Sequence, residues 1–164
     1  MTALKHTAAQ PALQHYTVPF LGAGTADKLL ELIRDHPNRS VSSETVGEDA
    51  LRAIKDTRFR FTPVGAERIV QTTPRELGFA VPKLAVEIVM GAQGQFGLAP
   101  CPHDGAVYTM LGVPLKYGRP NLFLSSIATF NVMQEEDRGP YELGVWEFER
   151  PINPDYNVWF LGPQ

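Results

Sequence analysis

A chain of 164 residues with 43% hydrophobic and 20% charged residues has the composition of one globular domain. This composition excludes a chain that is disordered from end to end. The formal net charge of −3 is too small to identify a partner by charge alone. The single cysteine excludes an internal disulfide and a zinc site built from several cysteines.

Residues 1–24 predict an extended arm, because Gln, Pro and His interrupt every short apolar run. The arm contains no apolar core of signal-peptide length, and no stretch of the chain approaches the roughly 20 apolar residues of a membrane span. Leu21-Gly22-Ala23-Gly24 lacks the full spacing of a dinucleotide-binding loop. The sequence therefore predicts a cytoplasmic protein with no membrane partner, in which residues 25–164 form a single α+β domain.

Helical patterns follow the arm. A helix is predicted from Thr25, which can cap its N-terminus, to His36-Pro37, and a second helix from Thr45, where the sequence has capping-box spacing. A short helical turn is predicted at 73–78. A longer helix is predicted at 82–97, where apolar residues recur every three to four positions.

Strand patterns dominate the remainder. Arg58-Phe59-Arg60-Phe61 alternates charged and aromatic residues, which predicts a strand with one buried face. Further strands are predicted at Val107–Val113, Leu122–Phe130, Tyr141–Glu149 and Asn157–Leu161. Because helices come first and strands later, we expect an α+β fold with N-terminal short helices followed by a mainly antiparallel β-sheet.

Three short motifs in the second half carry a resemblance. They are Glu76-Leu77-Gly78-Phe79, the run from Gly97 to Pro102, and the closing Trp159-Phe160-Leu161. On these motifs, residues 73–161 resemble a group of small uncharacterised bacterial proteins. The motifs mark structural features, namely a turn, the end of a helix and the last strand, and do not indicate any chemistry. The resemblance thus implies a bacterial protein but no activity and no site residues.

The densest polar cluster is the run from Cys101 to Gly105, at a predicted helix-to-strand junction. A cysteine beside an imidazole can be a thiolate nucleophile, and a carboxylate can orient that imidazole. Cys101, His103 and Asp104 are therefore the candidate catalytic residues of a small hydrolase or transferase. The favoured interpretation is a buried structural cysteine, because neighbours in sequence rarely meet productively and two prolines make the segment rigid. The other histidines are isolated, so no metal site is predicted.

Arg58 and Arg60 are the candidates for nucleic-acid binding. Arginines pair with phosphates, and exposed phenylalanines can stack on unpaired bases. On a strand, however, the two residue types face opposite sides, so phenylalanines in the core and arginines in solvent explain the pattern without RNA. RNA binding is therefore a third, less favoured interpretation. With no phosphate-binding loop, hydrolase elbow or kinase signature in the sequence, no cofactor is predicted.

Aromatic content gives the favoured function. The chain has two Trp, five Tyr and nine Phe, many of them in the last predicted strands. Most must fill the core, but aromatic residues on neighbouring strands can also form a protein-contact surface. We therefore predict a non-catalytic binding or assembly protein that engages a protein partner or itself through an aromatic-rich sheet. The candidate binding residues are Trp146, Phe148 and Trp159, besides Arg58 and Arg60.

A homodimer is the predicted assembly. Residues 121–133 contain no charged residue and no proline, so a strand there would suit a dimer interface or a sheet centre. The charge distribution is also uneven. Residues 52–83 hold seven basic and three acidic residues, whereas residues 120–164 hold two basic and seven acidic ones. The favoured interpretation is that both runs are solvated surface, and the alternatives are a basic binding face or two protomers that pack head to tail. If protomers pack antiparallel, the opposite charges would add long-range attraction.

Overall fold

This computed structural model describes residues 13–35, 46–116, 118–134 and 140–163, in which a single strand precedes each of two pairs of helices and four strands come last. In chain order the elements are β1 (Gln14–Phe20), α1 (Ala26–Asp35), α2 (Glu48–Ile54), β2 (Gly65–Thr72), α3 (Ala85–Phe96), α4 (Gly105–Gly112), β3 (Asn121–Leu124), β4 (Thr129–Met133), β5 (Glu142–Trp146) and β6 (Asn157–Leu161).

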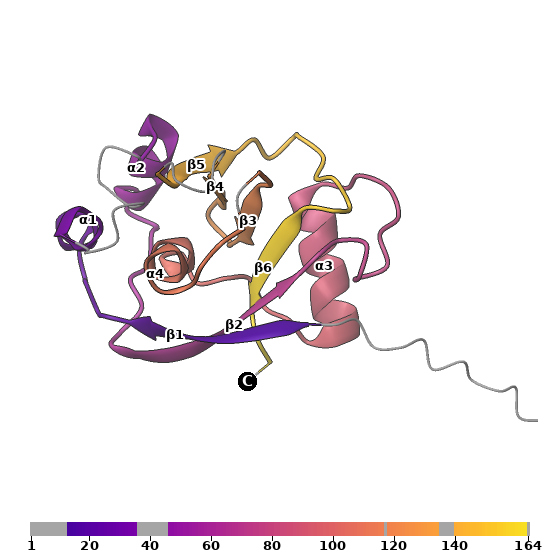
Figure 1. Ribbon diagram of the computed structural model, residues 1–164, viewed down its shortest axis with the longest axis horizontal. Coiled ribbons are helices and arrows are strands. Elements are labelled where there is room, and N and C mark those ends of the chain that lie inside the picture. The colour runs from indigo at the N-terminus through magenta and orange to yellow at the C-terminus, as the bar shows by residue number, and fades with distance from the viewer. Residues whose placement is uncertain (1–12, 36–45, 117, 135–139, 164) are drawn as a thin grey trace, which may run out of the picture.

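The strands form one sheet in the order β1-β2-β6-β3-β4-β5 (Figure 1). The sheet is mixed, because β3 and β6 run parallel while the other neighbouring pairs are antiparallel. The α+β class is confirmed. The predicted order of elements was wrong, since β1 precedes the helices and α3 and α4 lie between β2 and β3. The long connection that the parallel pair β3 and β6 requires is supplied by β4 and β5, which lie between them in the chain.

Each face of the sheet has its own core. Helices α1, α2 and α4 cover one face, where Phe123 and Trp159 lie in the core, and α3 covers the other, where Leu122 is buried. Neighbouring residues of β3 therefore face different cores, as the two-residue period of a strand requires. This explains the uninterrupted apolar run of β3, which is buried along its whole length at the centre of the sheet.

The predicted strand Val107–Val113 was wrong, because these residues belong to α4. Residues 105–110 are all buried, so the helix has no polar face and its sequence shows no helical period. The predicted strand Leu122–Phe130 is divided into β3 and β4. Ser125 turns the chain between them, with its hydroxyl and its backbone N–H both donating to the Ala128 carbonyl, at 2.6 and 3.3 Å.

Arg58-Phe59-Arg60-Phe61 forms no strand, although the two arginines are exposed, Phe59 is buried and Phe61 is half-buried. The segment is an irregular connection between α2 and β2, and β2 itself was not predicted. Residues 73–78 make a turn rather than a helix. The helix predicted at 82–97 is confirmed as α3, which Gly97 ends at a φ of 65°.

The N-terminal predictions are met in part. Within the predicted arm, β1 pairs with β2 along its whole length, so this part of the arm belongs to the sheet. Residues 1–12 lie outside the described residues, as do His36-Pro37 and Thr45, on which the end of the first helix and the start of the second were placed. The two helices themselves are present as α1 and α2.

Candidate functional site

The predicted catalytic cysteine lies in the approach to α4, inside the core. Cys101 is buried, and its Sγ fills the space beside Gly105, where an added Cβ would lie only 2.6 Å from the sulfur. Burial, assisted by the charge of Asp104, raises the pKa of the Cys101 thiol far above its ordinary value. A neutral, enclosed thiol is a poor nucleophile, so this geometry does not favour covalent catalysis by Cys101.

His103 joins two segments that are remote in sequence. Its Nδ1 accepts a hydrogen bond from the Arg60 backbone N–H at 2.8 Å, and its Nε2 lies 2.9 Å from Ser126 Oγ. Because Nδ1 is an acceptor, the neutral ring must carry its proton on Nε2 and donate it to Ser126. Burial, together with the charge of Arg60, lowers the pKa of His103 despite the opposing effect of Asp104. The neutral ring is therefore favoured.

This tautomer is the wrong one for activating a serine. A general base would need an unprotonated Nε2 facing Ser126 and a proton on Nδ1, which would then oppose the Arg60 N–H. The His103–Ser126 pair consequently acts as a structural link between the approach to α4 and the β3–β4 turn. Ser126 was not among the predicted site residues, and its one signal in the sequence is a Ser-Ser pair that interrupts an apolar run.

Asp104 binds a different segment. Its carboxylate is completely buried and accepts hydrogen bonds from Thr62 Oγ1 at 2.6 Å and from the Thr62 backbone N–H at 2.7 Å. Burial raises the pKa of Asp104, and the bonds from Thr62 oppose this by stabilising the charged form. The carboxylate thus holds the connection between α2 and β2 against the start of α4. Thr62 was not among the predicted site residues.

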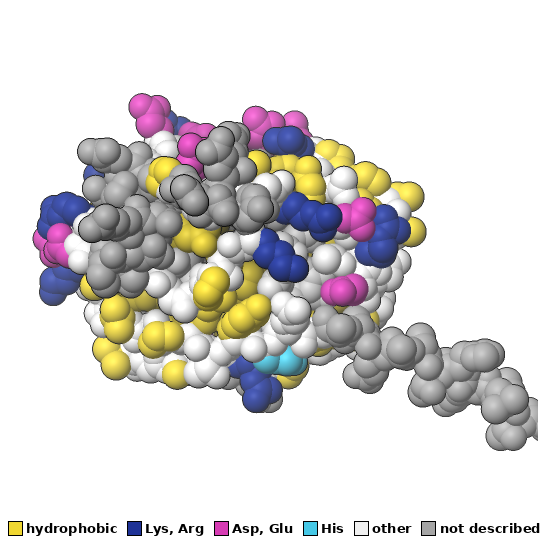
Figure 2. Space-filling model, viewed as in Figure 1, with side chains coloured by type: hydrophobic (Ala, Val, Ile, Leu, Met, Phe, Trp, Pro, Cys, Tyr) yellow, Lys and Arg dark blue, Asp and Glu magenta, His cyan; other side chains and the backbone are white. Residues whose placement is uncertain are grey.

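The arginines proposed for nucleic-acid binding are both exposed. Arg58 forms a two-bond ion pair with Asp56, with both N···O distances 3.0 Å, and these hydrogen bonds lower the pKa of Asp56 to about 2. Phe59 packs against the His103 and Phe130 rings rather than presenting its face to solvent. Acidic and basic side chains are mixed over the face shown in Figure 2. At Arg58 and Phe59 the arrangement therefore does not offer an unpaired arginine beside an open aromatic face, which is what binds single-stranded nucleic acid.

The three aromatic residues predicted to bind a partner lie in two different environments. Trp159 is buried, stacks on Phe123 with ring centres 5.1 Å apart, and donates from Nε1 to Asn121 Oδ1 at 3.2 Å. It is a core residue and has no exposed face for a partner. Trp146 and Phe148, by contrast, both line a groove at the edge of the sheet.

This groove, called the β5 groove below, has a volume of about 510 Å³. It lies where β4 begins and β5 ends, and its lining residues are Ile127, Ala128, Thr129, Val145, Trp146, Glu147, Phe148 and Glu149. Phe148 is 77% exposed, whereas Trp146 is nearly covered. Trp146 is fixed by a bond from its Nε1 to the Arg150 carbonyl at 2.9 Å and by the Arg150 guanidinium 4.0 Å above its ring.

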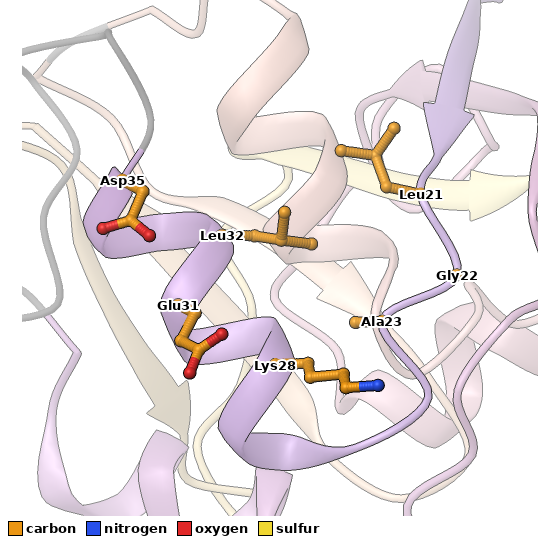
Figure 3. Close-up of a pocket in the computed structure, with 7 residues that line it drawn as sticks. All are labelled: Leu21, Gly22, Ala23, Lys28, Glu31, Leu32 and Asp35. Carbon is orange, nitrogen blue, oxygen red and sulfur yellow. The ribbon is translucent and has the colours of Figure 1, made fainter.

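A second pocket, of about 450 Å³, lies between α1 and the loop that follows β1 (Figure 3). Leu32 points from the helix towards the loop that carries Leu21, while Lys28, Glu31 and Asp35 follow one another along α1. Charges of both signs at this spacing are typical of a solvated helix face. We therefore assign this pocket no function.

Comparisons with family models, curated proteins and solved structures found no match to this chain. The resemblance of residues 73–161 to small bacterial proteins therefore stays a prediction. Within the described residues, no helix is long and apolar enough to cross a membrane. The same part of the chain contains no group of three or more His, Cys, Asp or Glu side chains that could hold a metal ion.

Proposed function

We propose that this protein binds an extended segment of a partner protein in the β5 groove. The observation that carries the proposal is the 77% exposure of Phe148 beside a groove lined by Ile127, Val145 and Trp146. An exposed phenylalanine beside other apolar side chains is typical of the centre of a protein contact. Burying such a ring between two proteins stabilises their complex by roughly 1.5–3 kcal/mol.

The edge of β5 supports an extended ligand. β5 is the last strand of the sheet, and its outer edge is occupied at Leu143, whose carbonyl accepts from the Gly47 N–H at 2.8 Å. Backbone groups two residues apart on a strand point to the same side, so those of Val145 point to this same outer edge. No strand pairs there within the described residues. A partner segment can therefore add as a short strand and place a side chain against Phe148.

The charge of the groove specifies the partner further. Glu147 and Glu149 are exposed on its rim, and neither takes part in an ion pair within the described residues. Arg150 is held over Trp146 instead. We therefore expect a segment with an apolar anchor flanked by lysine or arginine.

The test uses short synthetic peptides in extended, lysine-flanked form with a central leucine, compared with glutamate-flanked versions. Binding is followed by the fluorescence of Trp146, which lines the groove. Phe148→Ala should weaken binding of the lysine-flanked peptide by about tenfold or more, the usual size for a central contact residue. Val64→Ala is the matched control, because Val64 is also 77% exposed but does not line the groove.

Two results would contradict the proposal. One is the absence of binding by every lysine-flanked peptide. The other is equal binding of both peptide types with no effect of Phe148→Ala. Self-association is checked separately by sedimentation of the native protein and of Phe148→Ala. A dimer that dissociates in the variant would identify a second copy of this chain as the occupant, in place of a foreign segment.

A further inference from the structure

A polar cleft of about 200 Å³ lies three strands away from β5 in the sheet, where β1 begins, β2 ends and β6 begins. The strands contribute Gln14, Gln71 and Asn157, and the loop before β3 contributes Lys116 and Arg119. Its volume equals that of about seven water molecules at roughly 30 Å³ each, so it suits a small ligand.

The base of the cleft is polar although it is buried. Thr72 and Asn157 line it and are only 2% and 7% exposed. Asn157 is held in place by its Nδ2, which donates to Asn121 Oδ1 at 3.3 Å. Buried polar side chains at the base of a cavity are typical of a formed binding site and not of loosely packed surface.

The two glutamines of the cleft share one hydrogen-bond partner. The Tyr16 hydroxyl faces the amide oxygens of both, at 3.1 Å from Gln14 Oε1 and 3.4 Å from Gln71 Oε1. The hydroxyl has one proton, so it donates to one of these oxygens at a time, and the shorter distance favours Gln14. Both glutamines line the cleft, so their amides add hydrogen-bonding groups to it.

Positive charge predominates in the cleft. Within the described residues, neither Lys116 nor Arg119 forms an ion pair. Arg119 nevertheless helps, after Arg75, to lower the pKa of the nearby Asp155 carboxyl. Arg119 is positioned by a long bond of 3.5 Å from Nη1 to the Asp155 backbone carbonyl. The acidic residue of the cleft, Glu76, already accepts from Thr72 Oγ1 at 2.8 Å and from the Thr73 N–H at 3.2 Å.

We propose that this cleft binds a small oxyanion, either phosphate or a short carboxylate, between Lys116 and Arg119. Guanidinium and ammonium groups bind the oxygens of both anions through charge-assisted hydrogen bonds, and the glutamine amides donate to the remaining oxygens. The site is independent of the β5 groove.

The test titrates the native protein with inorganic phosphate and, separately, with succinate, and sodium chloride of equal ionic strength corrects for screening. Calorimetry gives the affinity, and the side-chain amide signals of Gln14, Gln71 and Asn157 give the location by NMR. Lys116→Gln and Arg119→Gln should each weaken binding about tenfold, because each removes a charge-assisted bond. Arg52→Gln is the control, because it also removes one exposed positive charge but at a residue of α2 that does not line the cleft, and it should leave the affinity unchanged.

Glu76→Gln gives a result in the opposite direction, because it removes the negative charge that repels an anion while keeping an acceptor for Thr72. It should strengthen binding. Binding of phosphate alone, of succinate alone or of both supports the site and identifies the anion class. No binding beyond the chloride control, or the same loss of affinity in Arg52→Gln as in Lys116→Gln, would overturn the proposal.

Discussion

The contact between Thr62 and Asp104 should contribute more to stability than a typical hydrogen bond. The Thr62 hydroxyl lies 2.6 Å from a carboxylate oxygen that is completely buried, which is the length expected for a hydroxyl bonded to a charged acceptor. Hydrogen bonds to charged groups contribute about 1.5–3 kcal/mol. Thr62→Val keeps the backbone bond and the shape of the side chain, so we expect it to lower the free energy of unfolding by about 2 kcal/mol.

A double-mutant cycle isolates this contact. Thr62→Val, Asp104→Ala and the double variant are unfolded in urea, and the coupling energy between the two positions is calculated from the free energies of unfolding. We expect a coupling of at least about 1.5 kcal/mol, and a fall in the melting temperature of Thr62→Val of roughly 4–8 °C. A coupling below about 0.5 kcal/mol would refute the reasoning, because the two residues would then act independently.

The same contact predicts a pH effect with a definite sign. The pKa of Asp104 is raised in the fold, so its contribution to stability is fully present below the unfolded pKa and is lost as pH rises through the folded value. Thr62→Val removes a bond that favours the charged carboxylate, which raises this pKa further. The loss of stability caused by Thr62→Val should therefore be larger at neutral pH than near pH 4, close to the unfolded pKa of about 3.9.

The pKa of His103 is lowered in the fold, so its contribution to stability should be present above the unfolded pKa of about 6.5 and be lost as pH falls through the folded value. In His103→Asn, the urea concentration at the midpoint of unfolding should therefore depend less on pH over this range. The buried thiol of Cys101 should react with a thiol reagent only as fast as the protein unfolds, and labelling at the rate of a free thiol would contradict its burial. In α3, Gly91→Ala should destabilise, because an added Cβ would lie 2.5 Å from the Phe79 ring, whereas Gly94→Ala has open space and should stabilise by up to about 1 kcal/mol. Thermal unfolding of the two glycine variants side by side checks this difference, and equal effects would contradict the packing of Phe79 on α3.

Much of the fold was predictable where the local pattern reflects the environment. The amphipathic spacing of α3 and its closing glycine identified that helix, and the sequence also identified the strand Asn157–Leu161, which is β6. The apolar run of β3 was compatible with a dimer interface or with a sheet centre. The structure places it at the centre, between β6 and β4, so β3 no longer requires a partner chain. The homodimer therefore stays a prediction without support from this strand.

Other elements depended on contacts that no local pattern contains. α4 is buried on all sides, and a helix without a polar face cannot be distinguished from a strand by periodicity. The alternation of Arg58 to Phe61 correctly separated exposed from buried side chains. It did so in an irregular segment, because bonds from Arg60 and Thr62 to His103 and Asp104 take the place of a strand partner.

The candidate sites also combine features that the sequence indicates with features that only the tertiary contacts decide. The sequence identified Cys101, His103 and Asp104 as a cluster and Trp146, Phe148 and Trp159 as candidate binding residues. In the structure Trp146 and Phe148 line the β5 groove, whereas Trp159 is buried in the core. The sequence could not give the partners of His103 and Asp104, because those bonds span 23 to 43 residues of sequence. Residue type specifies which groups can accept or donate a proton. The direction of each bond, and with it the tautomer of His103, is set by which backbone segment the fold brings within 3 Å of the ring.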